Sequence, residues 1–149
     1  MGMVRSEKKG SIYCTKDVHI LVIEDEEMIL DMMKIILESR GYRVSVSKDP
    51  GAGLKMYERN LYDVVLCDLA MPKFNGWKVA RYIKEYDASK KKVKTTVVLM
   101  TGSELSMESA DYKKEGVDYI LNKPIEYEKL YQIINHTTGD LQKGVPVDL

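Results

Sequence analysis

Polar side chains suited to a metal or phosphate site follow four apolar runs of this chain, at the point where each run ends. They comprise four carboxylates, a hydroxyl and an ammonium: Glu24, Asp25, Glu26, Asp68, Thr101 and Lys123. Carboxylate oxygens are ligands that Mg²⁺ prefers, and an ammonium or a hydroxyl can donate hydrogen bonds to phosphoryl oxygens. If these side chains meet in the fold, they suit a divalent cation and a phosphoryl group.

The apolar runs that precede these side chains have the composition of buried β-strands. Their residues are 19–23, 63–67, 96–100 and 119–122. The first run is continuous rather than alternating, as in a strand of a parallel sheet that is covered on both faces. In an open sheet of this kind, ligands bind outside the carboxyl ends of the strands, so we expect the polar side chains at one edge.

Segments with a helical spacing of apolar residues separate the strands. We expect helices over residues 27–40, 50–59, 77–86, 106–115 and 126–136, and a less buried strand over 42–46. The side chains expected to point inward in the first and last helices are Ile29, Met33, Ile36, Leu37, Leu130, Ile133 and Ile134. Strictly alternating strands and helices predict a parallel sheet with helices on both faces and right-handed crossovers.

Length and composition indicate one ordinary globular domain. The chain has 149 residues, 44% of them hydrophobic, and its 23 basic residues balance 23 acidic ones. No overall charge therefore favours nucleic acid or a membrane surface as a partner. No apolar run is long enough to span a membrane, and no apolar signal segment follows the charged N-terminus. We therefore expect a cytoplasmic protein.

The cysteines, histidines and clustered lysines show no arrangement that indicates a second site. Cys14 and Cys67 give no disulfide framework, and their spacing fits no metal site. His19 and His136 have no evident partner, so we expect both at the surface. The lysines between residues 90 and 94 lack interleaved aromatic residues, which favours a solvated loop over a nucleic-acid patch.

Each polar strand-end residue has a simpler structural explanation when it is taken alone. The acids after residue 23 could begin a helix, because the first turn of a helix favours negative charge. Asp68 could be a turn residue, Thr101 a helix cap and Lys123 a solvated strand end. The occurrence of all of them at successive strand ends favours one shared site.

Four short motifs together resemble the receiver domains of two-component response regulators. They are Ile20–Glu26, Asp68–Pro72 followed by Asn75–Gly76, Thr101–Gly102, and Lys123–Pro124. The resemblance covers residues 18–138 and implies a flavodoxin-like, doubly wound α/β fold, with five parallel strands in the order 2-1-3-4-5 and five helices. Residues 1–17 would then be a flexible N-terminal extension, and residues 139–149 a C-terminal tail.

The resemblance implies a phosphoacceptor and a magnesium site. Asp68 matches the residue that takes a phosphoryl group from a histidine kinase or a histidine phosphotransfer protein. Mg²⁺ would be bound directly by Asp25, Asp68 and the backbone carbonyl of Ala70. Glu24 would contact the ion through water, at a position that is more often Asp in the family. Glu26 matches a position that is often acidic without being a ligand.

The resemblance also implies how phosphorylation would be signalled. Thr101 would donate its hydroxyl to the phosphoryl group, and Lys123 would pair with the phosphoryl oxygens, or with Asp68 before phosphorylation. In the family the bond between Lys123 and Pro124 is cis. The surface that responds would be formed by residues 106–115 and 125–134, and its partner is unknown.

Two departures from the family pattern affect these expectations. An aromatic residue often lies three residues before the lysine, whereas this chain has Ile120, and Tyr119 is expected on the opposite face of the sheet. Ala70 and Ser103 occupy positions that tune hydrolysis of the acyl phosphate. Because neither side chain is a strong acid or base, we expect a slowly decaying phosphate.

Two other functions remain alternatives, one on the same residues and one on the same fold. A Mg²⁺-dependent phosphohydrolase of small phosphate esters would use the same acids, but haloacid-type enzymes carry a general acid where this chain has Ala70. A flavin or nucleotide binder would need a glycine-rich loop after the first strand, and this chain has none there. We expect a signalling domain that is not an enzyme, without direct nucleic-acid or membrane binding and without an output domain after His136.

Overall fold

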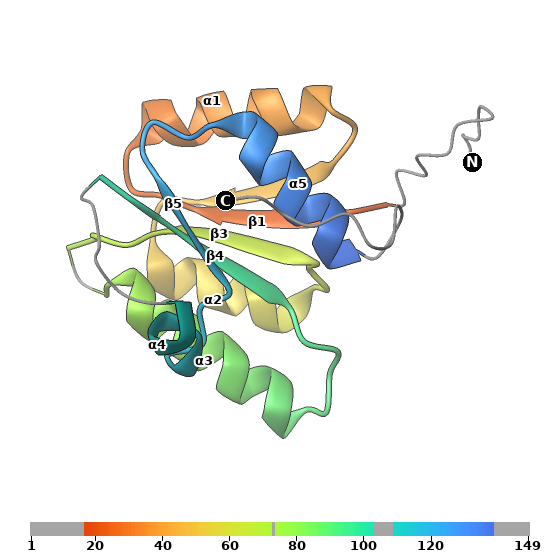
Figure 1. Cartoon of the computed structure of the whole chain (residues 1–149), viewed down its shortest axis with the longest axis vertical. Coiled ribbons are helices and arrows are strands. Elements are labelled where there is room, and N and C mark those ends of the chain that lie inside the picture. The colour runs from red at the N-terminus through yellow and green to blue at the C-terminus, as the bar shows by residue number, and fades with distance from the viewer. Residues whose placement is uncertain (1–16, 73, 103–108, 139–149) are drawn as a thin grey trace.

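The computed structural model describes residues 17–72, 74–102 and 109–138, in which five strands alternate with five helices along the chain (Figure 1). The strands are β1 (His19–Ile23), β2 (Arg43–Ser47), β3 (Val64–Asp68), β4 (Thr96–Thr101) and β5 (Tyr119–Asn122). The helices are α1 (Glu27–Ser39), α2 (Pro50–Arg59), α3 (Gly76–Ser89), α4 (Ser109–Lys114) and α5 (Tyr127–Thr138). Apart from Asp17, the predicted extension and the predicted tail lie outside the described residues.

All five strands are parallel and lie in the order β2-β1-β3-β4-β5, so the predicted flavodoxin-like topology is confirmed. The register aligns the carboxyl ends: Ile23 pairs with Ser47 and with Cys67, and Asp68 pairs with Met100. The residues that follow these strands therefore meet at one edge of the sheet, which lies on the left in Figure 1.

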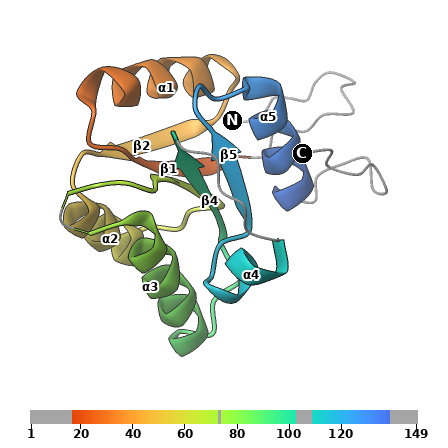
Figure 2. The same ribbon diagram turned by 60° about the vertical axis from the view of Figure 1, so that its left-hand side comes forward.

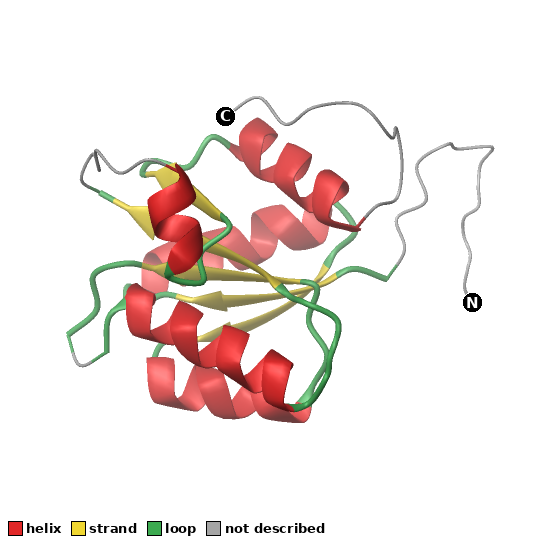
Figure 3. Ribbon diagram, turned by 60° about the horizontal axis from the view of Figure 1, so that its bottom comes forward, coloured by secondary structure: helices red, strands yellow, loops and turns green. Residues whose placement is uncertain are grey.

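The helices cover both faces of the sheet (Figures 1 and 2), and the view coloured by secondary structure shows the same layers (Figure 3). On the face of α1 and α5 the core includes Leu37, Val22 and Leu130, all fully buried. On the face of α2 and α3 it includes Tyr57, Leu99 and Ile83. The two cores explain why β1, β3 and β4 are apolar on both faces.

The helix boundaries follow from local capping and packing. Asp49 caps α2, because its carboxylate accepts the N–H of Ala52 at 2.8 Å, and Asn75 caps α3 by accepting the N–H of Lys78 at 3.1 Å. The helix α3 extends three residues beyond the predicted end, to Ser89, and the buried Asp87 lies in this added part. Of the helix predicted over 106–115, residues 106–108 lie outside the described residues.

The predicted inward positions of α1 are confirmed in part. Met33 and Leu37 are buried as expected, and Ile29 is partly buried and packs against the same core. Ile36 is only partly covered, and the third buried residue is Leu30, which the prediction did not include. The predicted inward residues of α5 are all buried.

A buried polar cluster fastens α2 and α3 to the beginning of β4. The Asp87 carboxylate is only 4% exposed. It accepts the Tyr57 hydroxyl at 2.6 Å and the backbone N–H of Thr95 at 3.1 Å. The Thr95 hydroxyl in turn donates to the carbonyl of Tyr62 at 3.2 Å. Burial, together with the adjacent Asp87 carboxylate, raises the pKa of Tyr57.

The expectation that His19 has no partner is wrong. Its Nδ1 lies 3.1 Å from the carbonyl oxygen of Leu61, and its Nε2 lies 2.9 Å from the hydroxyl of Ser45. Its ring also packs on Tyr62, with the ring centroids 4.3 Å apart. Ser45 belongs to β2, and Leu61 and Tyr62 lie in the loop just before β3, so the partners come from both sides of the interior strand β1. Burial and the nearby Arg43 guanidinium lower the pKa of His19.

We expect the stability of the protein to fall on mild acidification because of His19. The pKa of His19 in the fold lies below the ordinary value of 6.5. The contribution of its neutral imidazole to the free energy of unfolding is therefore complete above pH 6.5, and it is lost as the pH falls through the folded pKa. In His19→Gln, the free energy of unfolding should decrease less between about pH 7 and pH 5 than in the parent protein.

His136→Gln, which removes an exposed imidazole, provides the matched control. NMR titration of the two imidazoles identifies the residue directly. A His19 resonance that titrates above 6.5 would contradict the burial argument.

Among the described residues, no helix has the length and apolar character required to cross a membrane.

Candidate functional site

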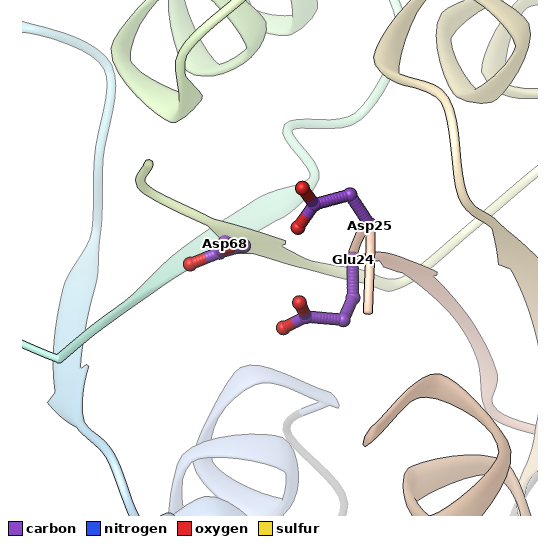
Figure 4. A group of neighbouring side chains, drawn as sticks. All are labelled: Glu24, Asp25 and Asp68. Carbon is purple, nitrogen blue, oxygen red and sulfur yellow. The ribbon is translucent and has the colours of Figure 1, made fainter. Parts of the chain in front are cut away.

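Three carboxylates converge at the carboxyl ends of β1 and β3. Glu24 and Asp25 follow β1, Asp68 is the last residue of β3, and one oxygen of each lies within 4.8 Å of the others. Figure 4 shows the side chains of Glu24 and Asp25 extending from the end of β1 toward the side on which Asp68 lies. Glu24 and Asp68 are buried, whereas Asp25 is exposed. A cluster of hard oxygen atoms with one exposed member fits a divalent cation such as Mg²⁺, which keeps several water ligands.

The Lys123 ammonium balances two of these carboxylates. Its Nζ lies 3.0 Å from Glu24 Oε1 and 3.2 Å from Asp68 Oδ1. Lys123 follows β5, so this bridge joins opposite halves of the sheet across 99 residues of sequence. The structure thus places Glu24, Asp25, Asp68 and Lys123 together, as the strand-end pattern predicted.

The pKa values of Glu24 and Lys123 are both raised in the site, but for different reasons. Burial raises the pKa of Glu24, although the backbone N–H of Glu26 and the Lys123 ammonium oppose this change. Burial alone would lower the pKa of Lys123, but its hydrogen bonds to Glu24 and Asp68 outweigh that effect and raise it. The lysine therefore stays charged, and it is held between the two carboxylates.

The acids after β1 do not cap α1, which was the simpler explanation of the acidic run. Glu24 is fully buried in the site and accepts the backbone N–H of Glu26 at 3.1 Å. Glu26 occupies the N-cap position of α1, but its side chain makes no capping hydrogen bond. Glu27 is the acidic residue of the first turn.

Thr101 and Ala70 lie at the edge where the predictions placed them. Thr101 is 3% exposed at the end of β4, and its carbonyl accepts the backbone N–H of Lys123 at 2.7 Å. Ala70 is exposed in the loop after β3, next to Leu69, whose N–H donates to the carbonyl of Met100 at 2.8 Å. Ser103, the other residue expected to tune phosphate decay, lies outside the described residues. The Lys123–Pro124 peptide bond is cis.

The side chains at the two positions before Leu121 lie on opposite faces of the sheet. Ile120 packs against the core of α2 and α3, and Tyr119 packs against the core of α1 and α5. Tyr119 therefore does not replace the aromatic side chain that is absent at position 120.

The tight approach of Gly76 to the site could not be inferred from the Asn75–Gly76 pair, which indicated only a turn. A Cβ on Gly76 would lie 2.9 Å from the carbonyl oxygen of Asp68 and 3.0 Å from the Cα of Leu69. Both are backbone atoms, which cannot move aside as a flexible side chain can. The glycine thus allows the beginning of α3 to lie directly against the residue at the centre of the site.

We expect Gly76→Ala to destabilise the fold by about 1–3 kcal/mol, as overpacking of a close contact does. Urea denaturation measures this loss directly. Gly102→Ala is the control at the same edge, since a Cβ there meets nothing within 4 Å, and it should change stability by less than about 0.5 kcal/mol. Equal effects of the two substitutions would contradict the packing argument.

Comparison with known proteins identifies the family of this chain. Residues 20–135 match the model of the response regulator receiver domain. The chain is 30% identical over 112 residues to YkoG of Bacillus subtilis, an uncharacterized transcriptional regulatory protein. The match includes 75% of this chain and 47% of YkoG. The chain spans between about a fifth and a half of the curated relatives first matched.

Solved structures show the same fold. A response regulator receiver domain protein from Clostridium thermocellum superimposes with a TM-score of 0.73 at 31% identity, over 82% of this chain and 94% of that one. The receiver domain of Saccharomyces cerevisiae Ssk1, in complex with the histidine phosphotransfer signaling protein Ypd1, superimposes with a TM-score of 0.76 at 16% identity, over 86% of this chain and 94% of that chain. With the family-model match over most of its length, this chain belongs to the response regulator receiver domain family of two-component systems.

Proposed function

We propose that this receiver domain accepts a phosphoryl group on Asp68 from a histidine kinase or a histidine phosphotransfer protein, in the cytoplasm. The observation that carries the proposal is the convergence of three carboxylate groups and one ammonium at a single edge of the sheet. A carboxylate oxygen of Asp68 would form a bond to phosphorus while the bond from phosphorus to the donor's imidazole nitrogen breaks. The electron pair of the broken bond stays on that nitrogen. With the other ring nitrogen protonated, the imidazole leaves as a neutral ring and no further proton transfer is needed.

The site would hold Mg²⁺ through Asp25, Asp68 and the backbone carbonyl of Ala70, with Glu24 acting through water. The bound ion would supply positive charge against the negative charge that the attacking carboxylate and the phosphoryl group bring together. Three carboxylate oxygens within 4.8 Å of one another support this assignment. Asp25 is the exposed member of the three, so it would be the first to contact an ion that arrives from solvent.

Lys123 and Thr101 would hold the phosphoryl group after transfer. The Lys123 ammonium already lies 3.2 Å from Asp68 Oδ1, so a short shift brings it to a phosphoryl oxygen. A hydroxyl contact from Thr101 would draw the end of β4 inward. Because the backbone N–H of Lys123 donates to the carbonyl of Thr101, movement of β4 would reach β5 and the helices beside it. The surface of α4, β5 and α5 is therefore the proposed output surface.

A test of the proposal is intact-mass measurement after incubation with acetyl phosphate and Mg²⁺. The expected result is a gain of one phosphoryl group, which is absent from Asp68→Asn and from a sample without magnesium. An adduct that persists in Asp68→Asn would contradict the assignment of the acceptor. Multiple turnovers on a phosphate ester would instead favour the phosphohydrolase, whose site would need the same acids.

The acyl phosphate is expected to decay slowly, with a half-life well above seconds, because the Ala70 side chain offers neither an acid nor a base to an attacking water. The measurement is the loss of the phosphoryl mass with time on the isolated domain. Ala70→Glu should accelerate the decay by introducing such a group at this exposed position. A half-life of seconds in the unmodified chain would contradict this expectation.

We propose that an apolar stripe on α1 is the docking surface for the phosphodonor protein. Met28, Met32 and Ile35 are 86%, 50% and 68% exposed, and their spacing places them on one face of the helix. The stripe begins three residues after Asp25, so a protein that covers it would reach the acidic site. We expect Met32→Glu to slow transfer from a phosphorylated histidine phosphotransfer protein, while phosphorylation by acetyl phosphate, which needs no docking, stays unchanged.

A further inference from the structure

The carboxylate of Glu24 is held at both of its oxygens. Its Oε1 lies 3.0 Å from Lys123 Nζ, and its Oε2 accepts the backbone N–H of Glu26 at 3.1 Å. The backbone N–H of Glu24 donates to the carbonyl of Ser47 at 3.1 Å, which fixes the residue to β2 as well. Because Glu24 is also fully buried, its carboxylate is a fixed support at the end of β1.

The Lys123 side chain extends across the carboxyl ends of the strands to reach this support. It starts directly after β5, and the strands lie in the order β1-β3-β4-β5. Its ammonium lies 3.2 Å from Asp68 Oδ1 at the end of β3 and 3.0 Å from Glu24 at the more distant strand β1. The contact with β1 therefore keeps the ammonium over the end of β3, where Asp68 lies.

The backbone of Lys123 is fixed to the strand on its other side. Its N–H donates to the carbonyl of Thr101, the last residue of β4, at 2.7 Å. Lys123 is thus held by β4 at its backbone and by β1 at its ammonium. A side chain that is fixed before a ligand arrives loses less conformational entropy when the ligand binds.

The Lys123 ammonium can accept a further partner without giving up Glu24. An ammonium has three N–H donors, and the two carboxylates account for two of them. The Lys123 side chain is 23% exposed, so its end is not closed off from an incoming group. A phosphoryl oxygen could therefore replace Asp68 as a partner while the contact with Glu24 stays in place.

Phosphorylation would change the charge of only one of the two acids. In an acyl phosphate the charge of the Asp68 carboxylate is replaced by charge on the phosphoryl oxygens, so Lys123 would follow it there. Glu24 keeps its charge, and among the described residues its only ion pair is that with Lys123. A buried carboxylate that loses its partner is strongly destabilised. Asp68 is thus the partner that can be exchanged, and Glu24 is the one that cannot.

We propose that Glu24 is a positioning residue for Lys123 and keeps the ammonium beside Asp68 in both states of the domain. On phosphorylation Lys123 exchanges Asp68 for a phosphoryl oxygen by turning about its contact with Glu24. The inference rests on the proposed function of Asp68, and this role is additional to the contact of Glu24 with Mg²⁺ through water. The length of the Glu24 side chain is essential, because aspartate is shorter by one carbon–carbon bond, about 1.5 Å.

The first test uses the full chain, labelled with ¹³C and ¹⁵N, in EDTA so that the site holds no metal. The two ε-protons of Lys123 should give distinct signals with a nuclear Overhauser effect to the γ-protons of Glu24. In Glu24→Asp the ε-proton signals should merge, because the carboxylate keeps its charge but no longer reaches the ammonium. Glu27→Asp is the matched control, since it shortens a 67% exposed glutamate by the same amount and should leave the Lys123 signals unchanged. Unchanged Lys123 signals in a folded Glu24→Asp would overturn the proposal.

The second test repeats the spectra after phosphorylation with acetyl phosphate and Mg²⁺, with the phosphoryl group verified by mass. The Overhauser effect between Lys123 and Glu24 should persist, and its loss in the phosphorylated chain would overturn the exchange. A parent chain that takes up no phosphoryl group would overturn the exchange together with the proposed function of Asp68. The metal-free spectra would then still decide whether Glu24 positions Lys123.

The third test separates positioning of Lys123 from binding of Mg²⁺. With saturating Mg²⁺, Glu24→Asp should be phosphorylated by acetyl phosphate at least about threefold more slowly than the parent, because its ammonium is no longer held in place. The apparent dissociation constant of Mg²⁺ should change by less than about twofold, because the charge at position 24 is kept. A weaker affinity for Mg²⁺ with an unchanged rate at saturation would overturn the proposal, since Glu24 would then act through the ion alone.

Discussion

Lys123→Met is expected to destabilise the protein by about 3 kcal/mol near pH 8, because it removes the cation that two buried carboxylates share. Glu24 is fully buried and Asp68 is 6% exposed, so neither can regain full hydration when the ammonium is lost. Lys123 itself is 23% exposed, which places the expected effect at the lower end of the range for breaking a buried ion pair.

The loss of stability in Lys123→Met should be larger at high pH than at low pH. Burial already raises the pKa of Glu24 and Lys123 opposes this change, so removal of the lysine raises that pKa further. An acid whose pKa is raised in the folded state favours folding below its unfolded pKa, and this contribution is lost as the pH rises through the folded pKa. The destabilisation in Lys123→Met should therefore be large near pH 8 and small near about pH 5.

Urea denaturation at several pH values measures this effect. Glu24→Gln combined with Lys123→Met should recover much of the stability, because the buried charge that remained without a partner is removed as well. Lys34→Met breaks only the exposed pair with Glu38 and should change stability by less than about 1 kcal/mol at every pH. A loss in Lys123→Met that is the same at pH 5 and pH 8 would contradict a role of Glu24 in it.

Asp87→Ala should cost about 3–4 kcal/mol, the second large effect expected for this chain. The carboxylate accepts two hydrogen bonds in a region closed to water, from the Tyr57 hydroxyl and the Thr95 amide. Its removal leaves both donors buried without this acceptor, and it also leaves the Lys92 ammonium without its nearest carboxylate. Since the cluster joins α2 and α3 to the beginning of β4, its loss loosens the connection between three elements.

Tyr57→Phe separates the hydrogen bond from the packing of the ring. It keeps the aromatic contacts and removes one hydroxyl, so we expect a loss of about 1 kcal/mol. The loss of stability in the double variant Tyr57→Phe/Asp87→Ala should be smaller than the sum of the losses in the two single variants, because both substitutions remove the same hydrogen bond. Asp31→Ala, at an exposed position of α1, serves as the control. If Asp87→Ala costs no more than this control, the cluster does not stabilise the fold.

The sequence alone determined the architecture and the composition of the candidate site. Continuous apolar runs such as residues 64–67 require cover on both faces, and their alternation with helical segments leaves a parallel sheet as the natural arrangement. Because the carboxyl ends of parallel strands meet at one edge, the convergence of Asp25, Asp68 and Lys123 followed from their positions after the strands. Local periodicity and turn chemistry were sufficient for these predictions.

Only the tertiary structure decided how the polar groups are paired and buried. The contact of Glu24 with Lys123 spans 99 residues, and the Tyr57–Asp87–Thr95 cluster joins three elements, so no local pattern marks either one. The partners of His19 are also distant in the sequence, since Ser45 and Leu61 lie 26 and 42 residues away. The sequence specifies which faces are apolar within a few residues, whereas the pairing of polar side chains depends on the register and spacing of elements that are distant in the chain.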